Sequence, residues 1–342
     1  MITKTFKWIG CHQVTAFFII TFVITWGLGF SYKAVMSGKY LLLPLMFLAT
    51  CGPALAGIMV ASISGSNQPS AKKRISWVAF FISWIVVTLV FIANHAFVNK
   101  GPVSTPLVVL VAISALPVAF IVNLVYTRFP VVRGFQLKSL RSGLNPAWIL
   151  IALLIFPFLT AISALISRFL GQESPSFSGL PATGFALVGW IAVKLLSQFF
   201  FFNGTGEEAG WRGFALPRLQ AYTSPLVAGL ILALLWVPWH LFLWIGEGRE
   251  VLTLSLWVSS YLLHIPSGII LCWCYNRSRG SVLIAGIAHA SANTIVALLQ
   301  PLEQNIMIIV LFVFVAAIVL IDHMWKRLPE DHPAVQKSLA IG

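Results

Sequence analysis

Two adjacent acidic residues, Glu207 and Glu208, interrupt an apolar stretch of the sequence. Neighbouring carboxylates in a low-dielectric medium repel each other, so one of them becomes protonated unless a cation neutralises it. Arg212 follows Glu208 by four residues, a spacing that places two side chains on one face of a helix. We therefore expect a structural ion pair between Glu208 and Arg212. A salt bridge that merely ends a helix needs only one acid, so we expect Glu207, about 100° away around the helix, to act on a substrate.

Three more polar residues lie in apolar stretches nearer the C-terminus. His289 and Asn293 are four residues apart and are separated by small residues, which allow a neighbouring helix or a substrate backbone to come close. His240 follows Trp236 by four residues in another apolar stretch. Each of these residues alone could simply hydrogen-bond one helix to another. Together with a carboxylate pair they form a set suited to hydrolysis, in which a carboxylate and a histidine activate water while a His/Asn pair stabilises an oxyanion.

Two further ionisable residues in apolar stretches are interpreted as structural. Lys194 is near the end of its stretch, where its long side chain can reach the membrane interface. His264 precedes Pro266 by two residues, and we expect it to bond the backbone carbonyls that this proline leaves without a donor. A functional role for His264 is the alternative.

The composition excludes most classes of soluble protein. Apolar residues make up 59% of the 342-residue chain and charged residues only 9%, against roughly 45–50% and about 25% in soluble domains. So little charge cannot cover a globule or keep a chain disordered, and no nucleic-acid partner is expected despite the net charge of +13. The positive charge instead indicates a membrane protein with basic cytoplasmic loops.

The apolar runs predict an all-α, polytopic transmembrane bundle. A bilayer core of about 30 Å requires some 20 apolar residues per helix. Ten runs approach this length, at about 14–30, 41–63, 77–98, 106–126, 147–166, 185–208, 225–245, 252–275, 281–299 and 304–322.

The distribution of lysine and arginine predicts the orientation in the cell membrane. With ten spans, 16 of these residues lie on the side of the two termini and 5 on the opposite side, so both termini should be cytoplasmic. The basic segment 127–146 is expected to contact anionic lipid headgroups.

The candidate catalytic residues can meet only if they lie at similar depths in the membrane. The apolar pattern indicates that the helix of Glu207 continues to about residue 216. Glu207 is then about 13 Å from the cytoplasmic end of its helix, while His289 is about 12 Å and His240 about 20 Å from theirs. Helix tilt can absorb these differences.

Three motifs on separate predicted helices resemble those of a known family. They resemble the motifs of the CAAX prenyl protease type II and bacteriocin-processing (CPBP, or Abi) intramembrane proteases. The matching residues are Glu207-Glu208-x-x-x-Arg212, Trp236-x-x-x-His240 and His289-x-x-x-Asn293. The prenyl proteases usually carry Phe where this chain has Trp236, which favours the wider bacterial-type family over a true prenyl-protein protease.

The resemblance implies an eight-helix protease core preceded by an additional helix pair. The motifs of the family lie on the fourth, fifth and seventh helices of its core, and here they lie on the sixth, seventh and ninth spans. We therefore expect an N-terminal pair with a basic loop at 1–76, a protease core at 77–322 with its motifs within 185–299, and a cytoplasmic tail at 323–342.

The resemblance also implies roles for the motif residues. It implies that Glu207 and His240 activate water and that His289 and Asn293 stabilise the oxyanion. It further implies that Glu208 and Arg212 hold the helix of Glu207 in place. The substrate would be a membrane-associated peptide or protein cut near the cytoplasmic face.

Whether a metal takes part stays open at this point. The HExxH spacing of zinc peptidases is absent from the sequence. Glu207, His240 and His289 could ligate zinc with water in the fourth position. We favour a reaction without a cofactor, because Asn293 suits an oxyanion hole better than a metal site.

Two other functions are compatible with ten spans and buried ionisable residues. A secondary transporter or channel is one alternative. Against it, the ionisable residues cluster in the C-terminal half, and no paired half-helix segments occur in the two halves. The second alternative is a catalytically silent scaffold or immunity protein with the same fold.

Overall fold

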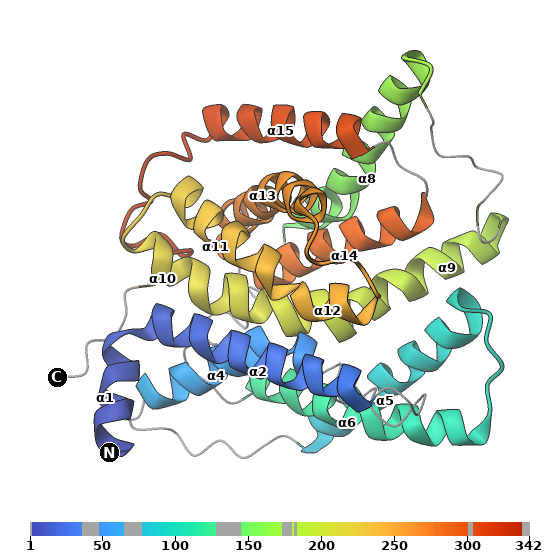
Figure 1. Cartoon of the computed structure of the whole chain (residues 1–342), viewed down its shortest axis with the longest axis horizontal. Coiled ribbons are helices and arrows are strands. Elements are labelled where there is room, and N and C mark those ends of the chain that lie inside the picture. Colours follow the sequence, from blue (N-terminus) through green and yellow to red (C-terminus); the bar gives the residue numbers. More distant parts are fainter. Residues whose placement is uncertain are drawn as a thin grey trace.

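The computed structural model describes residues 2–35, 48–64, 77–127, 145–172, 180, 183–299 and 304–336. All regular secondary structure in this part of the chain is helical, which confirms the predicted all-α class. The helices lie side by side in several layers (Figure 1). Their bounds are α1 (Ile2–Cys11), α2 (Gln13–Val35), α4 (Gly52–Ser64), α5 (Trp77–Ala93), η1 (Asn94–Val98), α6 (Thr105–Thr127), α8 (Pro146–Phe169), α9 (Gly184–Ser197), η3 (Gln198–Glu208), η4 (Trp211–Ala215), α10 (Leu216–Gln220), α11 (Pro225–Trp239), α12 (Leu241–Gly246), α13 (Leu254–Arg277), α14 (Val282–Leu298) and α15 (Gln304–Ile321).

The described helices coincide with the predicted membrane spans, and residues 41–47 of the second predicted span lie outside the described residues. Six are long and apolar enough to cross a bilayer, and four shorter apolar helices fill the remaining predicted positions. The chain is therefore a multi-pass membrane protein. The basic residues at 72–74 and most of the segment 127–146, which were used to predict orientation and headgroup contact, lie outside the described residues.

The first motif lies within one helical rod that runs from residue 184 to residue 220, which we call the site-bearing helix. It is composed of α9, η3, η4 and α10 in succession. It extends beyond residue 216, so the prediction that this helix continues past the two glutamates is confirmed. Its segments η3 and η4 have π-helical turns, which occur frequently at functional sites.

Glycines let neighbouring helices approach the site-bearing helix closely. A Cβ atom on Gly206 would lie 2.9 Å from the carbonyl oxygen of Thr50, which is next to α4. A Cβ on Gly286 of α14 would lie 2.9 Å from the Cα of Gly204. Both approaches are too short for any side chain. The site-bearing helix is therefore tightly held between α4 and α14.

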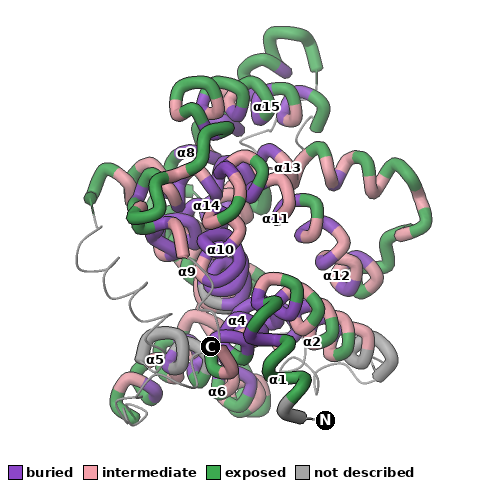
Figure 2. The backbone as a smooth tube through the Cα atoms, turned by 90° about the vertical axis from the view of Figure 1, so that its left-hand side faces the viewer, coloured by how far each residue is buried: buried purple, intermediate pink, exposed green. Residues whose placement is uncertain are grey.

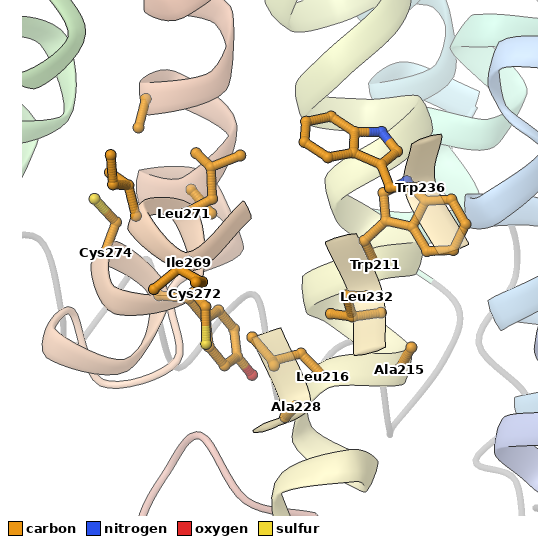
Figure 3. Packing of buried hydrophobic residues seen from close by; sticks show 14 of the residues in the cluster. Trp211, Ala215, Leu216, Ala228, Leu232, Trp236, Ile269, Leu271, Cys272 and Cys274 are labelled. Carbon is orange, nitrogen blue, oxygen red and sulfur yellow. The ribbon is translucent and has the colours of Figure 1, made fainter. Parts of the chain in front are cut away.

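Burial is concentrated around the site-bearing helix and decreases toward the periphery (Figure 2). Only 6% of the Trp77–Val98 span is buried, against 44% of the span Pro225–Gly246. α5 packs mainly on α6, and this hairpin presents apolar side chains outward, as lipid contact requires. The central core includes Trp211 of η4 and Trp236 of α11, which Figure 3 shows close together.

The start of α2 and the C-terminal tail both contact the end of the site-bearing helix. Arg218 donates from Nε to Oε1 of Gln13 at 3.0 Å and from Nη1 to Oε1 of Gln336 at 3.3 Å. Gln220 donates from Nε2 to the carbonyl of Ala334 at 2.8 Å. The start of α2 and the C-terminal tail therefore meet at the same end of the bundle, where they anchor the helix that carries the two glutamates.

Candidate active site

Glu208 and Arg212 form the buried ion pair that their spacing predicted. Arg212 donates from Nη1 to Oε1 of Glu208 at 2.7 Å, and the two side chains are 2% and 0% exposed. Arg212 also donates from Nη2 to the carbonyl of Gly268 in α13 at 3.3 Å. Its guanidinium lies over the ring of Trp236, 5.4 Å from the centroid. This single cation therefore connects the site-bearing helix with α11 and α13.

His289 binds the same carboxylate oxygen, a contact that the sequence did not indicate. Its Nδ1 lies 2.9 Å from Oε1 of Glu208, although the two residues are 81 positions apart. In a hydrogen bond between these two atoms, Nδ1 donates and the carboxylate oxygen accepts. His289 is thus bound through Nδ1 to the carboxylate that also holds Arg212.

Glu207 has a different partner from Glu208. Its Oε2 accepts a hydrogen bond from Nε1 of Trp236 at 2.8 Å. Both residues are buried, at 4% and 5% exposure. The ring of Trp236 also packs edge-on against the ring of His289, at 5.0 Å between centroids. Trp236 thus connects the first motif with the third.

His240 lies at the C-terminal end of α11, where that helix turns into α12. Its Nδ1 donates to the carbonyl of Trp236 at 2.9 Å, since a carbonyl can only accept. In neutral His240, Nε2 therefore carries a lone pair and can accept a hydrogen bond from water. Asn293 follows His289 by one turn on α14 and is partly exposed.

His264 of α13 also belongs to this cluster, although it was interpreted as structural. Its ring lies 4.8 Å from that of His240 and 5.0 Å from that of Trp236. The expectation about Pro266 is wrong, because Nδ1 of His264 bonds the carbonyl of Ser260 at 2.7 Å. The carbonyl that this proline deprives of a donor is the one four residues before it, at position 262.

The depth of His264 in the membrane, counted in residues from the end of its helix, would have identified it as a member of this cluster. It lies 13 residues from the end of α13 at Arg277, or about 20 Å along the helix. His240 was placed at that same depth from the sequence. Lys194, by contrast, is half-buried on α9 and lies 13 residues before Glu207, so it is about 20 Å from the two glutamates along the helix.

The described side chains contain no preorganised metal site. No three His, Cys, Asp or Glu residues in this part of the chain are arranged to hold an ion. Glu207, His240 and His289, the candidate zinc set, are therefore not assembled as ligands. Glu207 and His289 are instead tied to Trp236 and Glu208, respectively.

The fold and the site together define a multi-pass α-helical membrane protein with a buried cluster of carboxylates and histidines. Residues 189–295 match the family model described as type II CAAX prenyl endopeptidase Rce1-like. This range contains all three motifs. A curated relative, CAAX prenyl protease 2 of Methanococcus maripaludis, is 27% identical over 260 residues, which cover 71% of this chain and 93% of the relative. The two matches confirm the resemblance to the CPBP family and support a CAAX-protease-like endopeptidase.

Proposed function

We propose that this protein is an intramembrane endopeptidase that hydrolyses a peptide bond near the cytoplasmic membrane face with glutamate-activated water. The observation that carries the proposal is the contact between residues of all three motifs. Glu207 is bonded to Trp236, and Glu208 is bonded to His289. A buried carboxylate pair is costly in a membrane, and such groups usually mark functional sites.

In the proposed reaction, Glu207 and His240 prepare the nucleophile. The carboxylate of Glu207 takes a proton from a water molecule as general base. Nε2 of His240 accepts the second hydrogen bond of this water and orients it. The water oxygen attacks the carbonyl carbon of the peptide, and the abstracted proton is delivered to the leaving amine nitrogen.

His289 and Asn293 are proposed to stabilise the negative charge on the carbonyl oxygen. The side-chain amide of Asn293 is a neutral donor. His289 can donate through Nε2 only when its ring carries both protons, because Nδ1–H already points to Glu208. The buried carboxylate of Glu208 is the counterion that such an imidazolium requires. Glu208 would therefore support the oxyanion hole through His289 as well as hold Arg212.

We also propose that both termini are cytoplasmic. The contacts of Arg218 with Gln13 and Gln336 support this, because the start of α2 and the C-terminal tail meet at the same end of the bundle. The test is labelling of single cysteines in intact cells. Labelling from outside at 72–74 or 277–279 would contradict the orientation.

The proposed partners are a membrane-associated peptide or protein and the anionic headgroups of the bilayer. Because the archaeal relative is named a CAAX prenyl protease, a prenylated CAAX peptide is the first substrate to test. Trp236 differs from the Phe usual in the prenyl proteases, so unprenylated membrane peptides should be tested beside the prenylated peptide.

The deciding experiment compares membrane peptides in cells that express the wild-type protein or the Glu207→Ala variant. Terminal proteomics should reveal a defined new N- or C-terminus that appears only with the wild-type protein. The purified protein should then cut the corresponding peptide. A silent scaffold or a transporter would produce no Glu207-dependent terminus, and that result would defeat the proposal.

A chelator separates the two mechanisms. We propose that no cofactor takes part, and cleavage by the purified protein should therefore survive prolonged dialysis against a strong chelator. If dialysis abolishes cleavage and zinc alone restores it, Glu207, His240 and His289 must rearrange into a ligand set, and the metal-free mechanism is wrong.

A further inference from the structure

Trp236 is the position at which this chain departs from the usual second motif of the prenyl proteases. An indole carries an N–H donor that the ring of phenylalanine lacks. In this structure that donor points to Oε2 of Glu207, at 2.8 Å. The substitution therefore adds a hydrogen bond to the residue that we propose as the general base.

The surroundings of the two glutamates explain why this bond matters. Arg212 and His289 both bind Oε1 of Glu208, at 2.7 and 2.9 Å. Arg212 and His289 thus each direct one donor to Glu208, and Trp236 directs its donor to the neighbouring Glu207. A donor to a carboxylate stabilises its charged form and fixes the direction of its oxygens.

We propose that Trp236 is a positioning residue for Glu207, whose indole N–H holds Oε2 and thereby sets the orientation of the carboxylate toward the attacking water. This inference rests on the proposed function. Trp236 does not touch the reacting atoms. It acts through the orientation of the carboxylate, because a general base must lie within hydrogen-bonding distance of the proton it removes.

The ring of Trp236 has packing contacts that a phenylalanine can largely keep. It packs against the rings of His264 and His289, both at 5.0 Å, and lies under the guanidinium of Arg212 at 5.4 Å. The Trp236→Phe variant retains an aromatic face for these contacts and removes the N–H. Because these contacts require only an aromatic face, we expect the variant to fold.

The chain offers a matched control in Trp273. Its Nε1 also donates to a carboxylate, that of Asp322, at the far end of α13. The Trp273→Phe variant therefore loses the same kind of hydrogen bond outside the site. We expect Trp236→Phe to lower kcat about 10- to 100-fold with KM changed less than about twofold, since a hydrogen bond to a charged group is lost. Trp273→Phe should keep the wild-type kcat per folded molecule.

A purely structural role for Trp236 predicts a different result. Both variants would then lose activity only in proportion to the protein that unfolds, and kcat per folded molecule would stay unchanged. Wild-type kcat in a folded Trp236→Phe variant overturns the inference. If Trp236 only bound the substrate, the Trp236→Phe variant would instead have a raised KM and an unchanged kcat. This result also contradicts a positioning role.

The hydrogen bond has a spectroscopic readout that does not depend on turnover. In protein labelled with 15N at the indole nitrogens, the Trp236 signal is assigned by its loss in Trp236→Phe. It should move in Glu207→Ala, while the Trp273 signal stays in place. An unmoved Trp236 signal overturns the inference. If the wild-type protein cleaves nothing, the proposed function fails, and the indole signal still decides whether the bond to Glu207 exists.

Discussion

Helices α4 and α14 pack on the same site-bearing helix, but they contact it with different chemistry. The backbone at the start of α4 leaves no room for a Cβ atom at Gly206 or Gly210. α14 also comes close at its small residues, yet it adds a polar contact from His289 to Glu208 at 2.9 Å. Among the described residues, close backbone packing therefore marks the α4 interface, and close packing together with an ionic contact marks the α14 interface.

This difference separates positioning from chemistry in the site. Helix association in a bilayer is driven largely by close packing, because lipid is as apolar as the helix surface. The α4 interface can thus fix the distance and rotation of the site-bearing helix at little cost. The α14 interface places an ionisable pair at the site, which is costly in lipid and is expected where a reaction needs it. The N-terminal helices therefore support the site directly.

The largest expected effect is on turnover, at Glu207. Glu207→Gln keeps the shape of the side chain but cannot take a proton, so cleavage should fall by at least about 10²–10⁴-fold. Thermal stability in detergent should stay close to that of the wild-type protein, since repulsion from Glu208 is removed. Peptide cleavage and thermal unfolding measured on the same sample test both statements. If Glu207→Gln still cleaved the peptide while a stable Glu208→Gln variant did not, Glu208 would be the general base and Glu207 the structural residue.

The next effect is on stability, at the buried ion pair of Glu208 and Arg212 within the site-bearing helix. Glu208→Ala leaves the guanidinium of Arg212 buried without its carboxylate, which should cost about 3–5 kcal/mol of stability. Arg212→Ala should be similarly destabilising, and both variants should reduce the amount of folded protein in the membrane. Thermal unfolding in detergent measures the loss. A Glu208→Ala variant with wild-type stability would show that this buried ion pair does not stabilise the fold.

A smaller effect is expected at the close-packed α4 interface. A methyl group at Gly210 would collide with Pro53, so Gly210→Ala should destabilise the protein by about 1–3 kcal/mol. The matched control is Gly189→Ala on the same rod, where a Cβ has no neighbouring atom within 4 Å and little change is expected. Equal melting temperatures for the two variants would contradict the claim that α4 fixes the site-bearing helix.

The smallest effect concerns the hydrogen bond between α2 and α11. Trp239 donates from Nε1 to Oγ1 of Thr25 at 2.9 Å, and Thr25 donates to the carbonyl of Ala49 at 2.9 Å. Thr25→Val removes the hydroxyl and should cost about 0.5–1 kcal/mol, as such bonds between membrane helices do. Thr25→Ser keeps the hydroxyl and should be closer to wild type in thermal unfolding. The reverse order would show that the methyl group of Thr25, rather than its hydroxyl, stabilises this contact.

Contacts within one helix could be predicted from the sequence. The pair Glu208 and Arg212 follows from the number of residues per turn, which holds wherever the helix lies. The helices follow equally directly, because a bilayer demands long apolar runs. The continuation past the two glutamates was visible in the same pattern, which predicted it to about residue 216, and the helix reaches Gln220. The sequence alone therefore determined the class, the spans and the residues of the three motifs.

Contacts between helices were decided only by the tertiary structure. The bonds from His289 to Glu208 and from Trp236 to Glu207 join residues 81 and 29 positions apart, and His264 joins the cluster from a fourth helix. Each depends on how a helix is rotated about its own axis. A soluble helix reveals that rotation by its apolar stripe, but a membrane helix is apolar on all sides and shows no stripe. Only the packed bundle, with its glycine contacts and buried charges, fixes the rotation and hence the partner of each glutamate.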